Sequence, residues 1–289
     1  MNISTQAFSR NTAASSVVAL HCSLGSGRQW ARLGAELGAR ARLIAPDLVG
    51  YGRNACLLDL PVTLAQEVSA LREHLREAEG PIHLVGHSYG GAIAFKIATD
   101  PAYEPRVRSL TLIEPVLPTL LLESAADRRL YDQFAELAKE VSRDLWDGAT
   151  MEAIDKFSGF WNGSGPREVP APAARLRMIE HAPRLAFDFM AAFSEANVTM
   201  EAASLRVPTL LVSGGQSPNL TQRIVRRMGA IMAGARMRHL PDAGHMLAMT
   251  HAQLINPVIS AHIARADELA GVPLAAGQPV AETLRLVKG

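Results

Sequence analysis

Residues Gly86, Ser88 and Gly90 form a Gly-x-Ser-x-Gly motif, a pattern that can present a serine hydroxyl as a nucleophile. A mostly apolar run over residues 82–85 precedes the motif, and a segment with helical spacing follows it from position 92. Strand, sharp turn and helix in this order would hold the Ser88 hydroxyl above a sheet edge, where a base and a substrate can reach it. Such a turn is strained, and glycine is the least costly residue beside it. The motif therefore indicates serine chemistry rather than a purely structural turn.

A serine at its ordinary pKa is a poor nucleophile and needs a general base, which needs an orienting group in turn. Among the nine histidines of the chain, His245 is the best candidate for this base. It follows an expected strand and turn, and it comes after the nucleophile in the chain. By contrast, His21, His83 and His87 lie on or beside expected strand ends, and we expect them to pack or to form hydrogen bonds.

The composition of the 289 residues is that of a globular protein, with 48% hydrophobic and 20% charged residues. The net charge is +1 and there is no basic run, so neither nucleic acid nor a membrane is expected as a partner. The two cysteines, Cys22 and Cys56, do not make a disulfide framework or a Cys-x-x-Cys motif. Residues 1–16 contain no apolar signal core, and the run 16–21 is too short to span a bilayer. We therefore expect a cytoplasmic protein.

Strand and helix patterns alternate along most of the chain, which predicts the α/β class with a mostly parallel sheet flanked by helices. The expected strands cover residues 17–21, 41–45, 82–85, 106–113, 208–213 and 235–240. The expected helices that alternate with these strands cover residues 30–37, 64–78, 220–232 and 252–269. In such sheets, ligands bind at the carboxyl ends of the strands. The candidate residues Ser88, Glu114 and His245 all fall at such ends.

The pattern changes after the strand that ends at Glu114. From residue 118 to about 198 the strand signals disappear and segments with helical spacing replace them. We therefore expect one core domain of residues 1–117 and 199–289, interrupted by a helical lid over residues 118–198. The segment 271–289 has weak periodicity and is either a tail or a contact with a second subunit, so a homo-oligomer is left open.

Four motifs in this order resemble the α/β-hydrolase superfamily: the His21-led loop, Pro46-Asp47-x-x-Gly50-x-Gly52, the turn at Ser88, and Gly244-His245. The resemblance covers about residues 17–264. It implies a lidded, serine-dependent hydrolase of the group that includes esterases, carbon–carbon bond hydrolases and cofactor-free haloperoxidase-like enzymes. It also implies that the backbone N–H groups of Ser23 and Tyr89 form an oxyanion hole, and that no metal or organic cofactor is needed. The loop departs from the pattern, because it reads His21-Cys22-Ser23 where His-Gly is common.

The larger departure concerns the acid that should orient the histidine. In the family, an aspartate usually follows the strand expected at 208–213, but Ser217 stands in that place here. Glu114 is the alternative, because it ends the strand after the helix that follows Ser88, and some superfamily members resemble this arrangement. Asp242 is a weaker candidate, since its side chain can form hydrogen bonds within the turn that contains it. If no acid replaces the missing one, the protein binds a ligand with little turnover.

The sequence thus predicts a serine hydrolase that uses Ser88, His245 and Glu114 on a small-molecule substrate, by way of an acyl-enzyme. The aromatic and methionine content of the lid favours a small, largely apolar ester or related acyl compound. The expected pocket residues are Trp161, Phe157, Met190 and Met246. Carbon–carbon bond hydrolysis or perhydrolase chemistry on the same residues stays open, as does a hydrolase-fold ligand-binding protein.

Overall fold

The computed structural model describes residues 15–54, 60–163 and 171–271, so the tail expected at 271–289 lies almost wholly outside the described residues. Six strands form one sheet in the order β2-β1-β3-β4-β5-β6, and every neighbouring pair is parallel. The strands are β1 (Ser15–Leu20), β2 (Ala41–Ile44), β3 (Ile82–His87), β4 (Val107–Ile113), β5 (Thr209–Gly214) and β6 (Arg236–Leu240). β1, β3 and β5 are buried along their whole length, as expected for strands covered on both faces.

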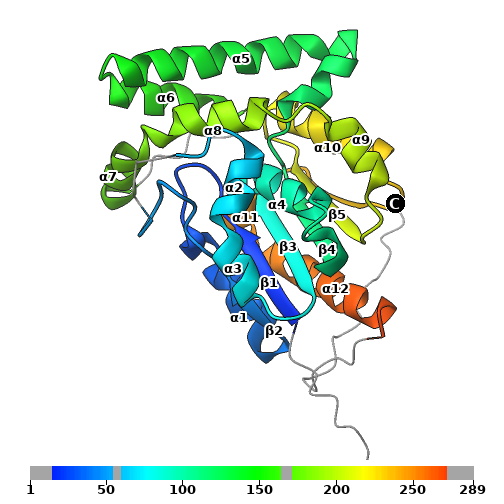
Figure 1. The fold of residues 1–289 in the computed structure, drawn as a ribbon. Coiled ribbons are helices and arrows are strands. Elements are labelled where there is room, and N and C mark those ends of the chain that lie inside the picture. The colour runs from blue at the N-terminus through cyan, green and yellow to red at the C-terminus, as the bar shows by residue number, and fades with distance from the viewer. Residues whose placement is uncertain (1–14, 55–59, 164–170, 272–289) are drawn as a thin grey trace, which may run out of the picture.

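Helices cover both faces of the sheet (Figure 1). One face is packed by α1 (Ala31–Leu37), α11 (Leu247–Thr250) and α12 (Ala252–Leu269), whose buried side chains form one hydrophobic cluster with Val17, Val85 and Val212. The other face is packed by α2 (Leu64–Ala70), α3 (Arg72–Glu77), α4 (Tyr89–Thr99) and α10 (Asn219–Ile231). This three-layer arrangement confirms the α/β class and the parallel sheet that the alternating pattern predicts.

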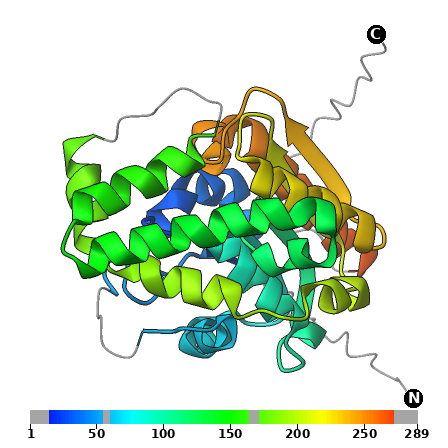
Figure 2. The ribbon, with the colours of Figure 1, turned by 90° about the horizontal axis from the view of Figure 1, so that it is seen from above.

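A helical insert lies between β4 and β5. It consists of α5 (Ala125–Trp146), α6 (Thr150–Trp161), α7 (Pro172–His181), α8 (Arg184–Phe193) and α9 (Val198–Ser204). The long helix α5 runs across the molecule on the side where the insert covers the core (Figures 1 and 2). The insert has a buried centre at Phe134 of α5, whose ring meets the rings of Phe160, Trp161, Phe189 and Phe193 at centroid distances of 5.5–5.8 Å. The packed rings belong to the same hydrophobic cluster as β3 and α4, so the insert is a cap whose core is continuous with that of the sheet below.

The structure differs from the expected elements in detail. The helix expected at 64–78 is divided at Leu71 into α2 and α3. The helical insert runs on through α9, past residue 198, and the short helix α11 was not expected. In the described ranges, no helix is long and apolar enough to cross a membrane.

Candidate functional site

Ser88 sits in a strained turn between the end of β3 and the start of α4. Its backbone has φ 57° and ψ −119°, a conformation that non-glycine residues rarely adopt. The glycines around it are required by space: a Cβ on Gly86 would lie 2.3 Å from the carbonyl oxygen of Gly90. A Cβ on Gly90 would lie 2.4 Å from the carbonyl oxygen of His21. The strand–turn–helix context expected of the motif is therefore present.

The three residues that the sequence assigned to acid, base and nucleophile meet in one chain of hydrogen bonds. The Ser88 Oγ lies 2.9 Å from His245 Nε2, and His245 Nδ1 lies 2.6 Å from Glu114 Oε2. All three side chains are buried, although they come from positions up to 157 residues apart. With Glu114 ionised, Nδ1 carries the proton and Nε2 is free to accept one from the serine.

Glu114 is held in place by the ends of two neighbouring elements. Its Oε1 accepts a hydrogen bond of 2.7 Å from the backbone N–H of Gly214, and its Oε2 accepts one of 3.3 Å from the hydroxyl of Thr221. Glu114 has a φ of 45°, so the chain is strained at this residue as it is at Ser88. The hydroxyl of Ser217, where the family usually has its acid, is buried and has no hydrogen-bond partner in the described part of the chain. The carboxylate at His245 thus comes from Glu114.

Two side chains brace His245 from other directions. The ring of Trp161, at the end of α6 in the cap, stacks on the imidazole at a centroid distance of 4.1 Å and an angle of 18°. His87 approaches with its Nε2 at 2.8 Å from the carbonyl oxygen of His245, while its Nδ1 lies 3.0 Å from Gln29 Nε2. Burial lowers the pKa of His87 to about 3, so this imidazole is neutral and its Nε2–H donates to that carbonyl.

The expected oxyanion donors lie at the ends of β1 and β3. Tyr89 is the first residue of α4, so its N–H has no acceptor within the helix. Neither this N–H nor that of Ser23 donates to an acceptor within the described ranges. The loop that carries Ser23 is held by His21, whose Nε2 lies 3.0 Å from Leu48 N and whose Nδ1 lies 2.8 Å from the carbonyl oxygen of Cys22.

The expected pocket residues differ in their exposure. Trp161 contacts His245 as described, and Phe157 packs edge-on against Trp161 at 5.9 Å. Met246 is half-buried beside His245 in the chain. Met190 is 53% exposed, and its place in the pocket stays a prediction. The helical period explains this exposure, because the adjacent Phe189 points inward and is 5% exposed.

Sequence reasoning missed a buried ion cluster between the cap and the core, which consists of Arg184, Asp188 and Glu67. The Arg184 guanidinium of α8 pairs with Glu67 of α2 and lies 3.1 Å from the Asp188 carboxylate. Glu67 also accepts a hydrogen bond of 2.6 Å from the Tyr89 hydroxyl. The four-residue spacing of Arg184 and Asp188 was the available signal, but nothing local indicates that Glu67, 117 positions away, joins them.

Burial favours the neutral form of both carboxyl groups in this cluster, and the single guanidinium of Arg184, which they share, only partly opposes it. Burial raises the pKa of Glu67 to about 7 against the opposing effect of Arg184, and it raises the pKa of Asp188 to about 6. The hydroxyls of Tyr89 and Tyr51 face the same carboxylates and stay protonated, since burial raises the pKa of each. The folded protein therefore holds protons here that the unfolded chain releases.

Glu67→Gln is expected to flatten the dependence of stability on pH. With its folded pKa near 7 rather than 4.5, Glu67 contributes stability below about pH 4.5 that is lost as the pH rises through 7, on the order of 3 kcal/mol. The glutamine variant should lose less of its free energy of unfolding than wild type between pH 5 and pH 8, as measured by urea unfolding. Glu73→Gln on α3, at a side chain that is 77% exposed, is the matched control and should follow wild type. Equal losses in wild type and Glu67→Gln would contradict the raised pKa.

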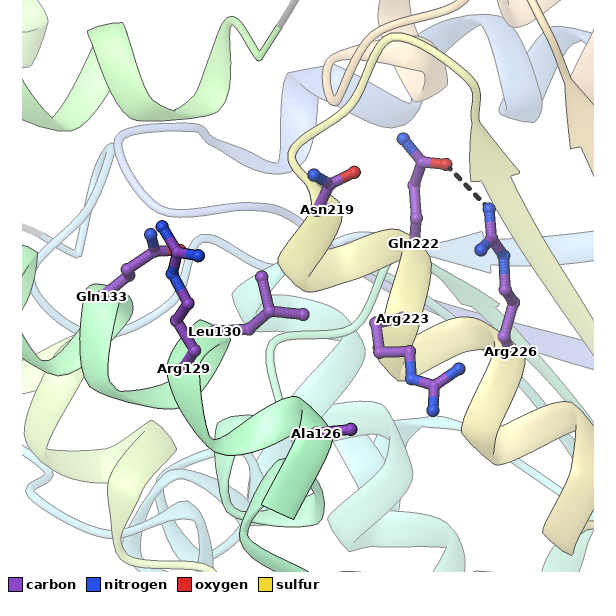
Figure 3. A pocket seen from close by; sticks show the side chains of 8 residues that line it. All are labelled: Ala126, Arg129, Leu130, Gln133, Asn219, Gln222, Arg223 and Arg226. Carbon is purple, nitrogen blue, oxygen red and sulfur yellow. Dashed lines mark hydrogen bonds between the residues drawn. The ribbon is translucent and has the colours of Figure 1, made fainter. Parts of the chain in front are cut away.

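A separate groove with a volume of about 470 Å³ lies between α5 and α10 (Figure 3). Its lining is mostly polar: Ala126, Arg129, Leu130, Gln133, Asn219, Gln222, Arg223 and Arg226. Arg223 is engaged with Asp127 at 2.7 Å, and Arg226 with Gln222 at 3.3 Å. None of the residues that meet around Ser88 lines this groove, so it is distinct from the site described above.

Comparison with known proteins gives one family and several structural relatives. Residues 17–258 match the model described as "Alpha/beta hydrolase family". The Mycobacterium tuberculosis "Lipase LipV" is 32% identical over 166 residues, which are 57% of this chain and only 56% of the lipase. MenH from S. aureus superimposes with a TM-score of 0.72 at 16% identity, covering 88% of this chain and 95% of MenH. Carboxylesterase CesB from Bacillus subtilis gives a TM-score of 0.64 at 17% identity, covering 86% and 84%. At these identities the two structures support the fold.

Proposed function

Because this chain belongs to the α/β-hydrolase family, we propose that it is a serine hydrolase that cleaves small, largely apolar esters or related acyl compounds. The single observation that carries the proposal is the continuous chain of hydrogen bonds from Ser88 through His245 to Glu114. The strained turn at Ser88 supports the same chemistry, as do the backbone N–H groups of Ser23 and Tyr89, which have no acceptor among the residues that the structure describes.

In the proposed reaction, the Ser88 Oγ attacks the carbonyl carbon of the substrate while its proton passes to His245 Nε2. The C–O bond to the alcohol then breaks, and His245 returns the proton to the departing alkoxide. Water then attacks the acyl-enzyme and gives a proton to His245. The bond between the acyl carbon and the Ser88 Oγ breaks, His245 returns the proton to this Oγ, and the carboxylic acid leaves. Glu114 keeps His245 in the tautomer that accepts at Nε2 and stabilises the imidazolium.

The oxyanion that forms at the carbonyl carbon is proposed to accept hydrogen bonds from the backbone N–H groups of Ser23 and Tyr89. Preorganised donors of this kind each contribute about 3–4 kcal/mol to the transition state. The position of Tyr89 at the start of an 11-residue helix adds the favourable end of the helix dipole.

The preference for an apolar acyl group rests on the cap. Trp161 covers the imidazole of His245, and the rings of Phe157 and Phe189 lie within 6.1 Å of one another beside it. These aromatic side chains beside His245 favour an apolar acyl group over a charged one. The charged groups of the nearby ion cluster already bind one another, which leaves no free guanidinium there to recruit a carboxylate substrate.

A series of p-nitrophenyl esters from acetate to decanoate tests the proposal. We expect turnover with a kcat/KM that rises from acetate to a short or medium acyl chain, and much lower values for a p-nitrophenyl hemisuccinate of similar length. The Ser88→Ala variant is the control for spontaneous and surface hydrolysis. Equal kcat/KM for hemisuccinate and its neutral counterpart would contradict the apolar preference, and no turnover of any ester by folded protein would contradict the esterase assignment.

A further inference from the structure

The two residues proposed to supply the oxyanion hole are both anchored, through their side chains, to the ion cluster of Arg184, Asp188 and Glu67. The Ser23 hydroxyl donates to Asp188 Oδ2 at 2.5 Å. The Tyr89 hydroxyl donates to Glu67 Oε1 at 2.6 Å, and Arg184 bonds to that same Oε1. The side chains of both oxyanion-hole residues are thus held by a single ion cluster, which bridges the cap and the core.

We propose that Arg184 and Asp188 of the cap helix α8 are positioning residues, which fix the backbone N–H groups of the oxyanion hole through Ser23 and Tyr89. This inference rests on the proposed function. The oxyanion hole is then complete only while α8 is seated on the core. Neither residue touches the reacting atoms; each acts through the hydroxyl that it holds.

The cluster is built for rigidity at this point. Arg184 is fully buried, its Nη1 donates to the carbonyl oxygen of Pro61 at 3.0 Å, and its guanidinium lies 5.9 Å from the centre of the Tyr89 ring. Its aliphatic stem packs so closely on Gly50 that a Cβ there would lie 2.8 Å from the Arg184 Cδ. Tyr51 adds a second hydroxyl to Asp188 Oδ2 at 2.5 Å. The Ser23 loop is therefore tied to a side chain with little freedom to move.

The loop needs such an anchor because its backbone is irregular. Leu24, the next residue, has a φ of 57°, and Cys22 occupies the place where the loop commonly has glycine. A small rotation at Ser23 would turn its N–H away from the oxyanion, and misplacement of about 1 Å at a reacting centre can cost about 100-fold in rate. When α8 is packed on the core, the hydrogen bond from the Ser23 hydroxyl to Asp188 holds the Ser23 N–H in one direction.

The test compares Ser23→Ala, Ser23→Thr and Asp188→Ala with wild type on the best p-nitrophenyl ester. Ser23→Ala keeps the backbone N–H and removes only the anchor, so we expect kcat to fall about 10- to 100-fold while KM changes less than about twofold. Ser23→Thr, which retains the hydroxyl, should restore kcat to within about threefold of wild type. Asp188→Ala should lower kcat similarly, and the double variant should not be additive, because both changes remove one contact.

Lys96→Met is the matched control for a loosened cap. Lys96, on the same helix as Tyr89 but near its other end, bonds to Glu195 at 3.0 Å and to Glu201 at 2.9 Å, so it also ties the core to the insert. This variant should keep the wild-type kcat even if its thermal midpoint falls as far as that of Asp188→Ala. A wild-type kcat in Ser23→Ala, or an equal loss in Lys96→Met, would overturn the inference while the serine mechanism stands. A folded wild type that neither turns over esters nor reacts at Ser88 would overturn the proposed function, and this inference with it.

Discussion

Replacing Ser88 by alanine is expected to lower kcat by about 10⁶-fold, the loss typical of a serine hydrolase without its nucleophile. The Oγ that forms the acyl bond is gone, and His245 can then only activate water from a position arranged for serine. The two backbone donors remain, so a residual rate above the uncatalysed reaction should persist. Steady-state hydrolysis of the best p-nitrophenyl ester, at enzyme concentrations high enough to detect slow turnover, measures the loss.

The strained backbone makes Ser88→Ala informative about stability as well. Serine and alanine both bear the cost of a φ of 57°, so the substitution leaves this strain unchanged and removes only one hydrogen bond, to His245, worth about 1 kcal/mol. The variant should therefore fold with a thermal midpoint close to that of wild type, which shows that the loss of rate is chemical. A folded Ser88→Ala protein that keeps more than a few per cent of wild-type kcat would exclude Ser88 as the nucleophile.

Glu114→Gln is expected to lower kcat by about 10⁴-fold with a smaller change in KM. The carboxylate Oε2 lies 2.6 Å from His245 Nδ1 and fixes the proton there. Glutamine keeps the size of the side chain, and its oxygen can still accept from the Gly214 N–H. Its amide N–H₂ then faces His245, which favours the tautomer with the proton at Nε2, where it cannot accept from serine.

Ser217→Ala is the matched control for Glu114→Gln. Ser217 stands where the family usually has its acid, yet its buried hydroxyl has no partner in the part of the chain that the structure describes. Its removal should leave kcat within about twofold of wild type and should not lower the free energy of unfolding appreciably. A large loss in Ser217→Ala together with a small loss in Glu114→Gln would contradict the assignment of the acid to Glu114.

The fold could be predicted from the sequence because its signals are local. Buried strands such as β3 read as apolar runs, and helices such as α12 show apolar residues at helical spacing. The break of the 64–78 helix at Leu71 could not be predicted, because no glycine or proline marks it. The end of the insert was equally hidden, since α9 is a short helix whose burial depends on the core beneath it.

Of the site, the parts that follow from chain order were predictable and the parts that depend on packing were not. Ser88, Glu114 and His245 each follow a strand of one parallel sheet, so topology alone brings them to one edge. The sequence does not show which of Phe189 and Met190 on α8 is buried, because both are apolar and only the packed cap distinguishes them. Glu67 reads as an ordinary surface residue of an amphipathic helix, and only the fold shows that Arg184 meets it.

Covalent labelling tests whether Ser88 is a nucleophile activated by His245 and Glu114. Wild type is treated with a fluorophosphonate and digested, and the modified peptide is identified by mass spectrometry beside Ser88→Ala, His245→Ala, Glu114→Gln and Ser217→Ala. We expect one adduct, on Ser88, formed at wild-type rate in Ser217→Ala, much more slowly in His245→Ala and Glu114→Gln, and not at all in Ser88→Ala. A folded wild type that stays unlabelled, or that carries the adduct on another residue, would contradict the assignment of Ser88 as the nucleophile.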